Sequence, residues 1–276
     1  MMNFQKGEFI YFNKPYQMSS FGALAFVRTR ISRRLGIKRA KIGHAGTLDP
    51  LATGVLILCT GKATKQIETL QLHDKEYTAT LQLGATTASF DREHPVDQTY
   101  PVEHITRELI DDVLKRFVGD ISQVPPAFSA CNINGKRAYE VARKGREVQL
   151  EAKTVHIEEI EVTNYDDAAK QLSIRVVCGK GTYIRSLARD IGEALGSGAY
   201  LTALCRTRLG DVRIEECLTM DNFQEWLDAQ EVEPWEECVQ NPPGTGKNRN
   251  RNRKKKKFTP IDFDAQEQGD GNNKEK

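Results

Sequence analysis

The sequence predicts an α+β fold in which a mixed, largely antiparallel sheet is flanked by helices. Several segments alternate apolar and polar residues with the period of two that a half-buried strand requires, and others repeat apolar residues at helical spacing. No internal repeat is found, and strands and helices do not alternate regularly enough for a doubly wound parallel sheet. Together these observations favour the α+β class.

The first 84 residues contain three predicted strands and one predicted helix. Phe9–Phe12 is a short apolar run of strand length. Two serines that can cap a helix precede Phe21–Ile31, in which apolar residues recur at helical spacing. Val55–Cys59 is apolar enough to be a buried strand, and Tyr77–Gly84 alternates apolar with polar side chains as a strand with one face in the core does.

The remainder of the chain contains two predicted strands and three predicted helices. Thr106–Phe117 is a helix capped by its first residue and ended by a glycine shortly after its last. Val155–Val162 and Gln171–Cys178 alternate as strands do. Thr182–Leu195 carries its apolar residues on one stripe, which predicts an amphipathic helix, and a short helix over Phe223–Leu227 follows.

The composition excludes several classes of protein. The 276-residue chain has 39% hydrophobic and 28% charged residues, which is typical of a folded, water-soluble protein. No run approaches the ~20 apolar residues of a membrane span, and the N-terminus lacks the apolar core of a signal peptide, so we expect neither a membrane protein nor a secreted one. The six cysteines stand at least 12 residues apart, which argues against a zinc site or a disulfide scaffold and indicates reduced thiols in the cytoplasm.

Positive charge is concentrated near the C-terminus. Residues 241–276 contain ten Lys and Arg against five Asp and Glu, whereas residues 1–240 contain 30 basic and 33 acidic side chains. Because segment 241–276 has few apolar residues, we predict that it is a disordered basic tail behind one folded domain, residues 1–240. Such a tail either serves as a nonspecific arm for RNA phosphates or only keeps the protein soluble.

The segment Lys41–Gly54 is the strongest candidate for chemistry. Three glycines and a proline within fourteen residues indicate a tightly specified loop ahead of a buried strand, a common setting for catalytic groups. Asp49 precedes Pro50, so its backbone is held extended and its carboxylate could serve as a nucleophile or a base. The alternative is an ordinary Asx turn, which the loop taken by itself favours.

A partly buried carboxylate needs an opposite charge. Lys180, Tyr183 and Arg185 come together where the strand that ends at Cys178 gives way to the next helix. Arg185 is therefore a candidate partner for Asp49. The alternative, which this segment taken by itself favours, is that Arg185 is an exposed arginine on the helix surface.

Three segments carry a resemblance to a known family. GHAGTLDPLATGVL from Gly43, KEYTATLQLG from Lys75 and CGKGTYIRSLARDIG from Cys178 follow one another, after Asn13–Pro15, as in the TruB family of tRNA pseudouridine-55 synthases. The similarity spans roughly residues 8–215. It implies the pseudouridine synthase fold and the conversion of uridine 55 in the T-loop of tRNA to pseudouridine. It further implies an enzyme of the bacterial type. Many members carry a separate C-terminal RNA-binding domain, for which the residues after about Thr219 are too few, so we expect this chain to lack it.

The resemblance assigns the catalytic roles to two residues. Asp49 matches the family's catalytic aspartate, which attacks the target nucleoside while the uracil is detached, turned and rejoined through carbon. Prior removal of a proton from the sugar remains open as an alternative. Arg185 matches the arginine that pairs with this aspartate and keeps it ionised.

Four further residues match substrate contacts of the family. His44 matches a histidine placed at the RNA, where its imidazole can fill the gap left by an extruded base. Tyr77 matches the tyrosine that stacks on this base, and its place in an alternating strand also fits a core residue. Tyr183 and Leu204 match residues that contact the substrate in the pocket.

The chain departs from the family pattern at several positions. Gln17 stands where the family usually has glycine, and Phe128 where it has tyrosine. A lysine and an arginine of the family are replaced around Asn132 and at Cys205, which removes positive charge from expected RNA contacts. Asp91 stands where the family has an RNA-contacting acidic residue, within a stretch that otherwise matches poorly. These changes leave the catalytic aspartate in place.

The expected partner is the T-arm of tRNA, bound by a monomer that needs no other protein. We expect no cofactor and no metal, because the isomerisation consumes neither redox equivalents nor a nucleotide, and the sequence has no GxGxxG fingerprint or metal-ligand cluster. One alternative is a dyskerin-like synthase that uses guide RNA, against which the stand-alone bacterial form of Asp49–Gly54 argues. The other is a non-catalytic RNA chaperone that uses the same surface.

Overall fold

A nine-stranded sheet forms the centre of the computed structural model, which describes residues 1–129, 131–133, 136–138, 141 and 150–235. Its strands follow the order β1 (Phe9–Lys14), β3 (Thr53–Thr60), β12 (Ala199–Leu209), β4 (Lys75–Leu83), β11 (Gln171–Cys178), β10 (Lys153–Asp166) and β7 (Gly119–Gln123). Two short strands, β2 (Ile42–His44) and β13 (Val212–Arg213), pair with β3 and β12. All pairs are antiparallel except β3 with β12, so the predicted mixed, largely antiparallel sheet is confirmed.

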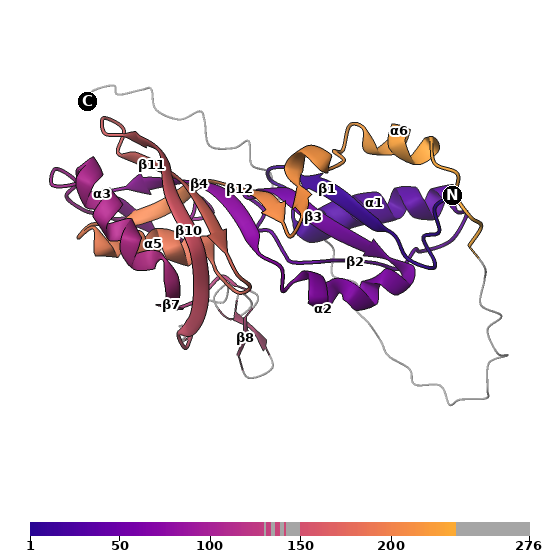
Figure 1. The fold of residues 1–276 in the computed structure, drawn as a ribbon, viewed down its shortest axis with the longest axis horizontal. Helices are drawn as coiled ribbons and strands as arrows, with labels where there is room; N and C mark the ends of the chain where they lie inside the picture. Colours follow the sequence, from indigo (N-terminus) through magenta and orange to yellow (C-terminus); the bar gives the residue numbers. More distant parts are fainter. Residues whose placement is uncertain (130, 134–135, 139–140, 142–149, 236–276) are drawn as a thin grey trace, which may run out of the picture. The chain divides into compact units, whose positions relative to one another are not determined.

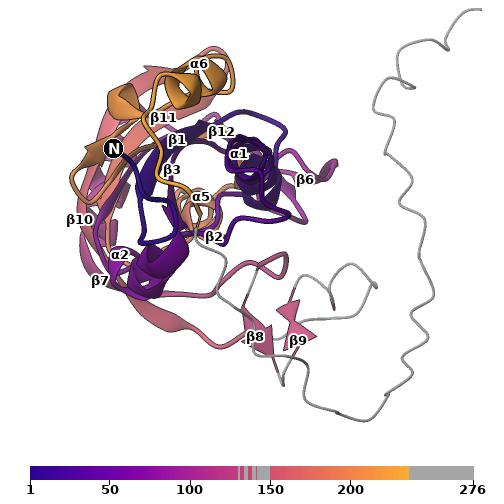
Figure 2. The same ribbon diagram turned by 90° about the vertical axis from the view of Figure 1, so that its right-hand side faces the viewer.

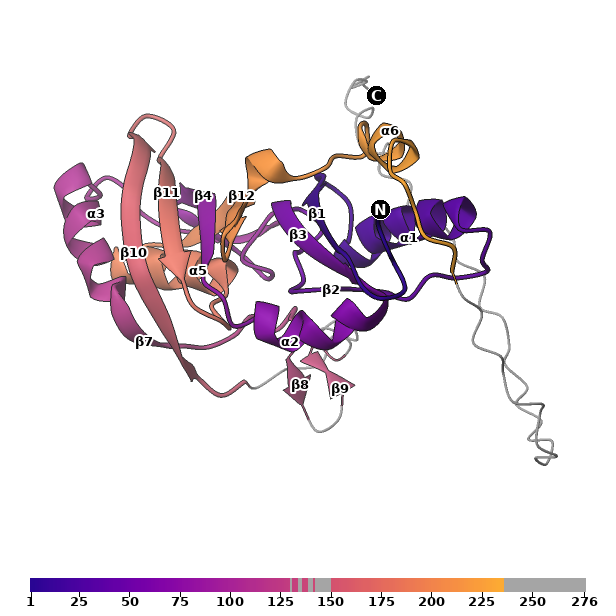
Figure 3. The same ribbon diagram turned by 45° about the vertical axis from the view of Figure 1, so that its right-hand side comes forward.

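Helices cover the sheet in two groups (Figure 1). α3 (Arg107–Leu114) and α5 (Ile184–Ala194) enclose one apolar core with β4, β10 and β11. α1 (Ser20–Arg34) and α6 (Phe223–Asp228) enclose a second core with β1 and β3. β12 joins the two halves of the sheet, as Figure 3 shows. The strands at this junction carry much of the site described below.

Short elements complete the described part of the chain. They are α2 (Ile67–Leu70), the pair β5 (Ala85–Thr87) and β6 (Val96–Thr99), the pair β8 (Asn132–Ile133) and β9 (Lys136–Arg137), and the 3₁₀ turns Gly61–Gln66, Lys115–Phe117 and Ile214–Glu216. β8 and β9 stand apart from the main sheet (Figure 2). Within the described ranges no helix is long and apolar enough to cross a membrane. The predicted tail, residues 241–276, lies outside these ranges.

All the predicted strands and helices are present, with ends displaced by a few residues. The prediction for Gln171–Cys178 coincides with β11. Thr106 caps α3 as expected, because its hydroxyl accepts a hydrogen bond from the backbone N–H of Leu109 at 3.3 Å. The helix predicted to end at Ile31 continues to Arg34 in α1.

The central strand β12 could not be predicted from periodicity. Its pairing with β4 shifts register between Leu201 and Ala203 and again between Arg206 and Arg208. Each bulge interrupts the alternation of faces, so apolar side chains do not recur with a period of two along the strand. The same irregularity places Arg206, which is 2% exposed, inside the protein.

Candidate active site

The loop between β2 and β3 presents Asp49. Just beyond the loop, Gly54 of β3 has a φ of +106°. A Cβ there would lie 2.2 Å from the backbone oxygen of Arg206, so the close approach of β3 to β12 requires glycine. Nearer Asp49, the hydroxyl of Ser20 accepts a hydrogen bond from the N–H of Leu48 (2.8 Å) and donates one to the carbonyl of Leu48 (2.9 Å). Between these anchors, 38% of the Asp49 side chain remains exposed.

Arg185 binds Asp49 through two parallel hydrogen bonds. Its Nε donates to Oδ2 at 2.9 Å and its Nη2 to Oδ1 at 3.1 Å, the bidentate geometry that orients a carboxylate most firmly. Other N–H groups of the guanidinium donate to the carbonyls of Ser89 (3.2 Å) and Phe128 (2.9 Å). Arg185 is only 4% exposed, so the alternative of an arginine on the helix surface is wrong.

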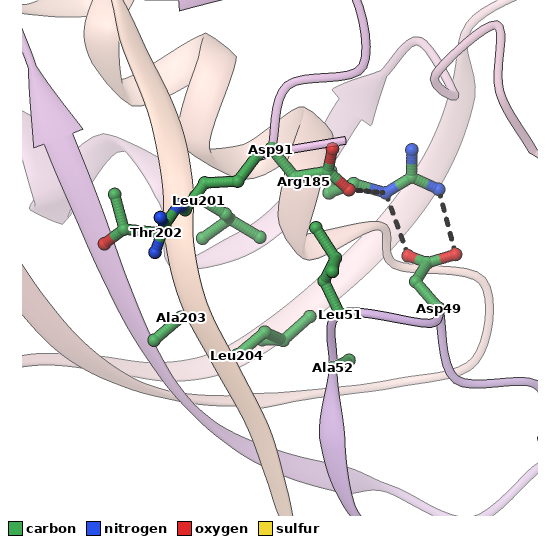
Figure 4. A pocket seen from close by; sticks show the side chains of 10 residues that line it. Asp49, Leu51, Ala52, Asp91, Arg185, Leu201, Thr202, Ala203 and Leu204 are labelled. Carbon is green, nitrogen blue, oxygen red and sulfur yellow. Dashed lines mark hydrogen bonds and ion pairs between the residues drawn. The ribbon is translucent and has the colours of Figure 1, made fainter. Parts of the chain in front are cut away.

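Asp91 places a second carboxylate at the same guanidinium. Its Oδ2 lies 3.8 Å from Nε of Arg185, and 8% of its side chain is exposed. Figure 4 shows Asp49 and Asp91 approaching the guanidinium from different sides. Arg185 therefore faces two carboxylates. Of these, only Asp49 also lines the pocket of ≈ 810 Å³ described next.

All six residues assigned by resemblance line one pocket of ≈ 810 Å³: Asp49, Arg185, His44, Tyr77, Tyr183 and Leu204. They come from β2, the loop that carries Asp49, β4, the start of α5 and β12, so the junction of the two half-sheets brings them together. The volume is within the ~300–1,000 Å³ of sites for small ligands and suits a single nucleotide. Tyr77 belongs both to this pocket and to the core, as its alternating position allows.

Burial sets the protonation of the titratable groups around Asp49. Desolvation, reinforced by the Arg206 cation, lowers the pKa of His44, so its imidazole is neutral near pH 7. Its Nδ1 is buried without a hydrogen-bond partner among the described residues. Burial raises the pKa of Tyr77 and of Tyr183, so both phenols stay protonated. Within the described ranges, no cluster of three or more His, Cys, Asp or Glu could hold a metal ion.

Comparison with known proteins decides the family. A family model described as "TruB family pseudouridylate synthase (N terminal domain)" matches residues 33–184. A second, described as "tRNA pseudouridylate synthase B C-terminal domain", matches residues 185–240. The chain belongs to the TruB family of pseudouridylate synthases.

Relatives of this TruB-family enzyme cover most of its length. The tRNA pseudouridine synthase B of Bacteroides thetaiotaomicron is 63% identical over 234 residues, which is 84% of this chain and 98% of that protein. The protein of the same name from Phocaeicola vulgatus is 62% identical over 232 residues, again 84% and 98%. A solved structure, "Crystal Structure of a Cbf5-Nop10-Gar1 Complex", has 30% identity and a TM-score of 0.59 and covers 83% of this chain, which spans 58% of that one.

The two TruB family models meet inside one structural unit. Their boundary falls at Arg185, in the first turn of α5. Residues matched by the C-terminal model supply β12, which pairs with both β3 and β4, and α6, which packs into the core around α1. The residues that make up the TruB pocket therefore come from both matched regions.

Arg206 is a buried cation of the TruB site that the sequence patterns did not reveal. Its Nε donates to the carbonyl of Val55 at 2.8 Å and its Nη2 to the carbonyl of Gly46 at 3.2 Å. It therefore ties β12 to both flanks of the loop that carries Asp49. The register shift between Arg206 and Arg208 interrupts the alternation of apolar and polar residues in β12, so no local sequence pattern indicates that Arg206 is buried.

Lys14 is a second buried cation near Asp49 that the sequence patterns did not reveal. Its Nζ donates to the carbonyls of Pro15 (2.9 Å), Met18 (2.6 Å) and Pro50 (3.3 Å), and the residue is fully buried. The three donors of an ammonium match these three acceptors. Lys14 thus joins the end of β1 to the residue that follows Asp49.

We expect the rate of pseudouridine formation at saturating RNA to fall as the pH rises through about 8. Burial lowers the pKa of Lys14 from 10.5 to about 8. A neutral amine has one donor too few for its three carbonyls, which loosens the loop beside Asp49. Single-turnover rates measured across this pH range test the expectation.

Unfolding does not account for this fall in rate. Between about pH 8 and pH 10.5 the unfolded chain binds a proton at Lys14 that the folded chain does not, so this group makes the free energy of unfolding rise with pH. Thermal unfolding over the same range provides the control. In the variant Lys14→Met, the single-turnover rate should no longer fall as the pH rises through about 8. The same dependence of the rate on pH in the variant and the parent would contradict the role of Lys14.

The structure accounts for two of the departures from the TruB pattern. Gln17 has a φ of +58°, in the left-handed region that glycine adopts most easily, which explains the glycine usual in the family. The backbone carbonyl of Phe128, not its ring, binds Arg185, so replacing tyrosine by phenylalanine preserves this contact. Cys205 lies in the parallel pairing of β12 with β3, and Asn132 belongs to β8. Nothing in the structure explains either of these two substitutions.

Proposed function

We propose that this enzyme converts uridine 55 in the T-loop of tRNA to pseudouridine, with Asp49 as the nucleophile. The observation that carries the proposal is the bidentate pair of Asp49 and Arg185 at the wall of a nucleotide-sized pocket. The relatives that are 62–63% identical are named tRNA pseudouridine synthase B, which supports tRNA as the substrate. A structural neighbour with 28% identity and a TM-score of 0.57 is described as bound to a substrate RNA, which supports an RNA ligand for this fold.

The reaction exchanges one bond to the sugar for another. The bond between N1 of uracil and C1′ of ribose breaks, a bond between C5 and C1′ forms, and a proton leaves C5 while N1 gains one. The ionised carboxylate of Asp49 attacks the nucleoside and holds one fragment while the base turns. Arg185 holds this carboxylate in a fixed orientation, because two of its N–H groups donate to both carboxylate oxygens.

The target nucleotide has to leave the RNA stack before Asp49 can reach it. Extruding a nucleotide costs a few kcal/mol, and a loop nucleotide is less costly to extrude than one in a helix. Tyr77 offers an aromatic face to the extruded base, and Leu204 and Tyr183 complete the walls of the pocket. The neutral imidazole of His44 fills the space that the base leaves behind.

We propose further that the enzyme acts as a cytoplasmic monomer, without a protein partner. Residues 241–276 are then a basic arm that contacts RNA phosphates without sequence preference. A guide-RNA-dependent synthase and a non-catalytic chaperone remain the two competing functions.

Incubation of the protein alone with a T-arm hairpin distinguishes these functions. We expect pseudouridine at the position of uridine 55, without guide RNA or a second protein. A hairpin with cytidine at this position serves as the control and should yield none. Product only with added guide RNA would favour the guide-dependent enzyme, and RNA binding without product under either condition would favour the chaperone.

A further inference from the structure

Basic residues are concentrated around α1 in a way that the catalytic pocket does not explain. Between Glu8 and Asp49 the chain contains eight Lys and Arg and no acidic residue. The rest of residues 1–240 contains 22 basic and 33 acidic side chains. The described part of the chain therefore combines a strongly positive helical segment with an acidic remainder.

Four of these cations line one groove along α1 and the turn after it. The groove has a volume of ≈ 610 Å³ and is lined by Arg28, Arg33, Lys38 and Arg39 together with Phe21. Within the described ranges, no carboxylate lies within 4.0 Å of any of the four cations. Their charges are thus available to an outside anion.

Several charged residues on other described surfaces are paired with opposite charges. On α3 and the turn after it, Arg107 pairs with Asp111 at 3.0 Å and Lys115 with Asp112 at 2.8 Å. Arg175 contacts three glutamates. The groove along α1 thus lacks the local charge pairing of these surfaces, which is the arrangement expected of a surface that binds a polyanion.

The groove begins at the rim of the catalytic pocket. Phe21 lines both, is 61% exposed, and has the guanidinium of Arg28 5.5 Å from its ring centroid. Ser20, one residue before it, anchors the loop of Asp49. An RNA whose nucleotide enters the pocket past Phe21 can thus continue directly onto the four cations.

We propose that this groove binds the phosphate backbone of the RNA stem next to the extruded nucleotide. The inference rests on the proposed function, because it takes RNA as the ligand of the pocket. Phosphate contacts of this kind fix the register of an RNA without reading its sequence. The groove therefore positions the loop over Asp49, and the pocket selects the nucleotide.

Binding and single-turnover assays with two charge-matched variants test the proposal. Arg33→Gln/Lys38→Gln removes two exposed cations from the groove, and the control Lys115→Gln/Arg116→Gln removes two exposed cations after α3. The probes are a T-arm hairpin with its whole stem and one with the stem cut back close to the loop. Dissociation constants are measured over a range of salt concentrations.

We expect the groove variant to bind the long hairpin about tenfold more weakly than the parent and to reduce the slope of log K against log salt by about 1–2. Affinity for the short hairpin and the rate at saturating RNA should stay unchanged, as should every value for the control variant. The conservative change Arg33→Lys, which keeps the charge, should retain the affinity of the parent. Equal thermal unfolding of variants and parent excludes a folding defect.

Equal affinity of the groove and control variants for the long hairpin would overturn the proposal, as would equal losses on the long and short hairpins. Failure of the proposed function looks different. In that case the parent forms no pseudouridine from either hairpin, while the groove and control variants still differ in their affinity for RNA.

Discussion

The variant Asp49→Asn forms no detectable pseudouridine, yet binds the T-arm hairpin as tightly as the parent. An amide has nearly the shape of the carboxylate but no negative charge, and it is a poor nucleophile. It still offers one oxygen to Arg185, so the pocket keeps its form. We expect the single-turnover rate to fall by at least about 10⁴-fold, the scale on which loss of a nucleophile slows other enzymes.

Asp120→Asn is a suitable control for this variant. Asp120 is exposed and pairs with His156 at 2.7 Å on β7 and β10, and it does not line the pocket. We expect this variant to keep the parent rate. Product from Asp49→Asn at more than a trace of the parent rate would show that another group performs the attack.

Replacing Arg185 with lysine lowers the single-turnover rate by about 10²- to 10³-fold, the range for loss of one fixed polar contact in an active site. A lysine ammonium is a single point of charge and cannot meet both oxygens of Asp49 and also the carbonyls of Ser89 and Phe128. Asp49 then loses its fixed orientation. RNA affinity should change much less than the rate.

The variant Arg185→Met separates orientation from charge. It leaves Asp91, with only 8% of its side chain exposed, and Asp49 without their shared cation, so we expect the free energy of unfolding to fall by about 3 kcal/mol. Arg189→Lys on the same helix is the control, because Arg189 pairs with Asp190 at 2.6 Å and lines no part of the pocket. If Arg185→Met kept the rate and the stability of the parent, Arg185 would neither orient Asp49 nor stabilise the two carboxylates.

Local sequence patterns were sufficient for the regular elements. Strand β11 alternates buried and less buried residues up to Val176, and α5 keeps its apolar residues on one stripe, so both could be predicted from periodicity. β12 could not, because two bulges break its alternation, although it holds the two halves of the sheet together. The strand conformation of β12 follows from its pairing with β3 and β4, which no local sequence pattern reveals.

The site was less predictable than the fold, because its contacts span long stretches of chain. Asp49 and Arg185 are 136 residues apart, and in the sequence only charge logic and family resemblance link them. Lys14 and Arg206 look like ordinary polar residues in sequence, and their burial depends on backbone carbonyls from other elements. In sequence, Asp91 matches an acidic residue of the family, but its approach to Arg185 is a property of the folded chain.

A structure of Asp49→Asn bound to a T-arm hairpin shows whether residue 49 meets the target nucleotide. We expect uridine 55 to be turned out of the loop and to lie against Tyr77, with the residue 49 side chain within ~3.5 Å of the sugar–base junction and still bound to Arg185. Uridine 55 stacked within the loop, or seated on a surface away from residue 49, would contradict it.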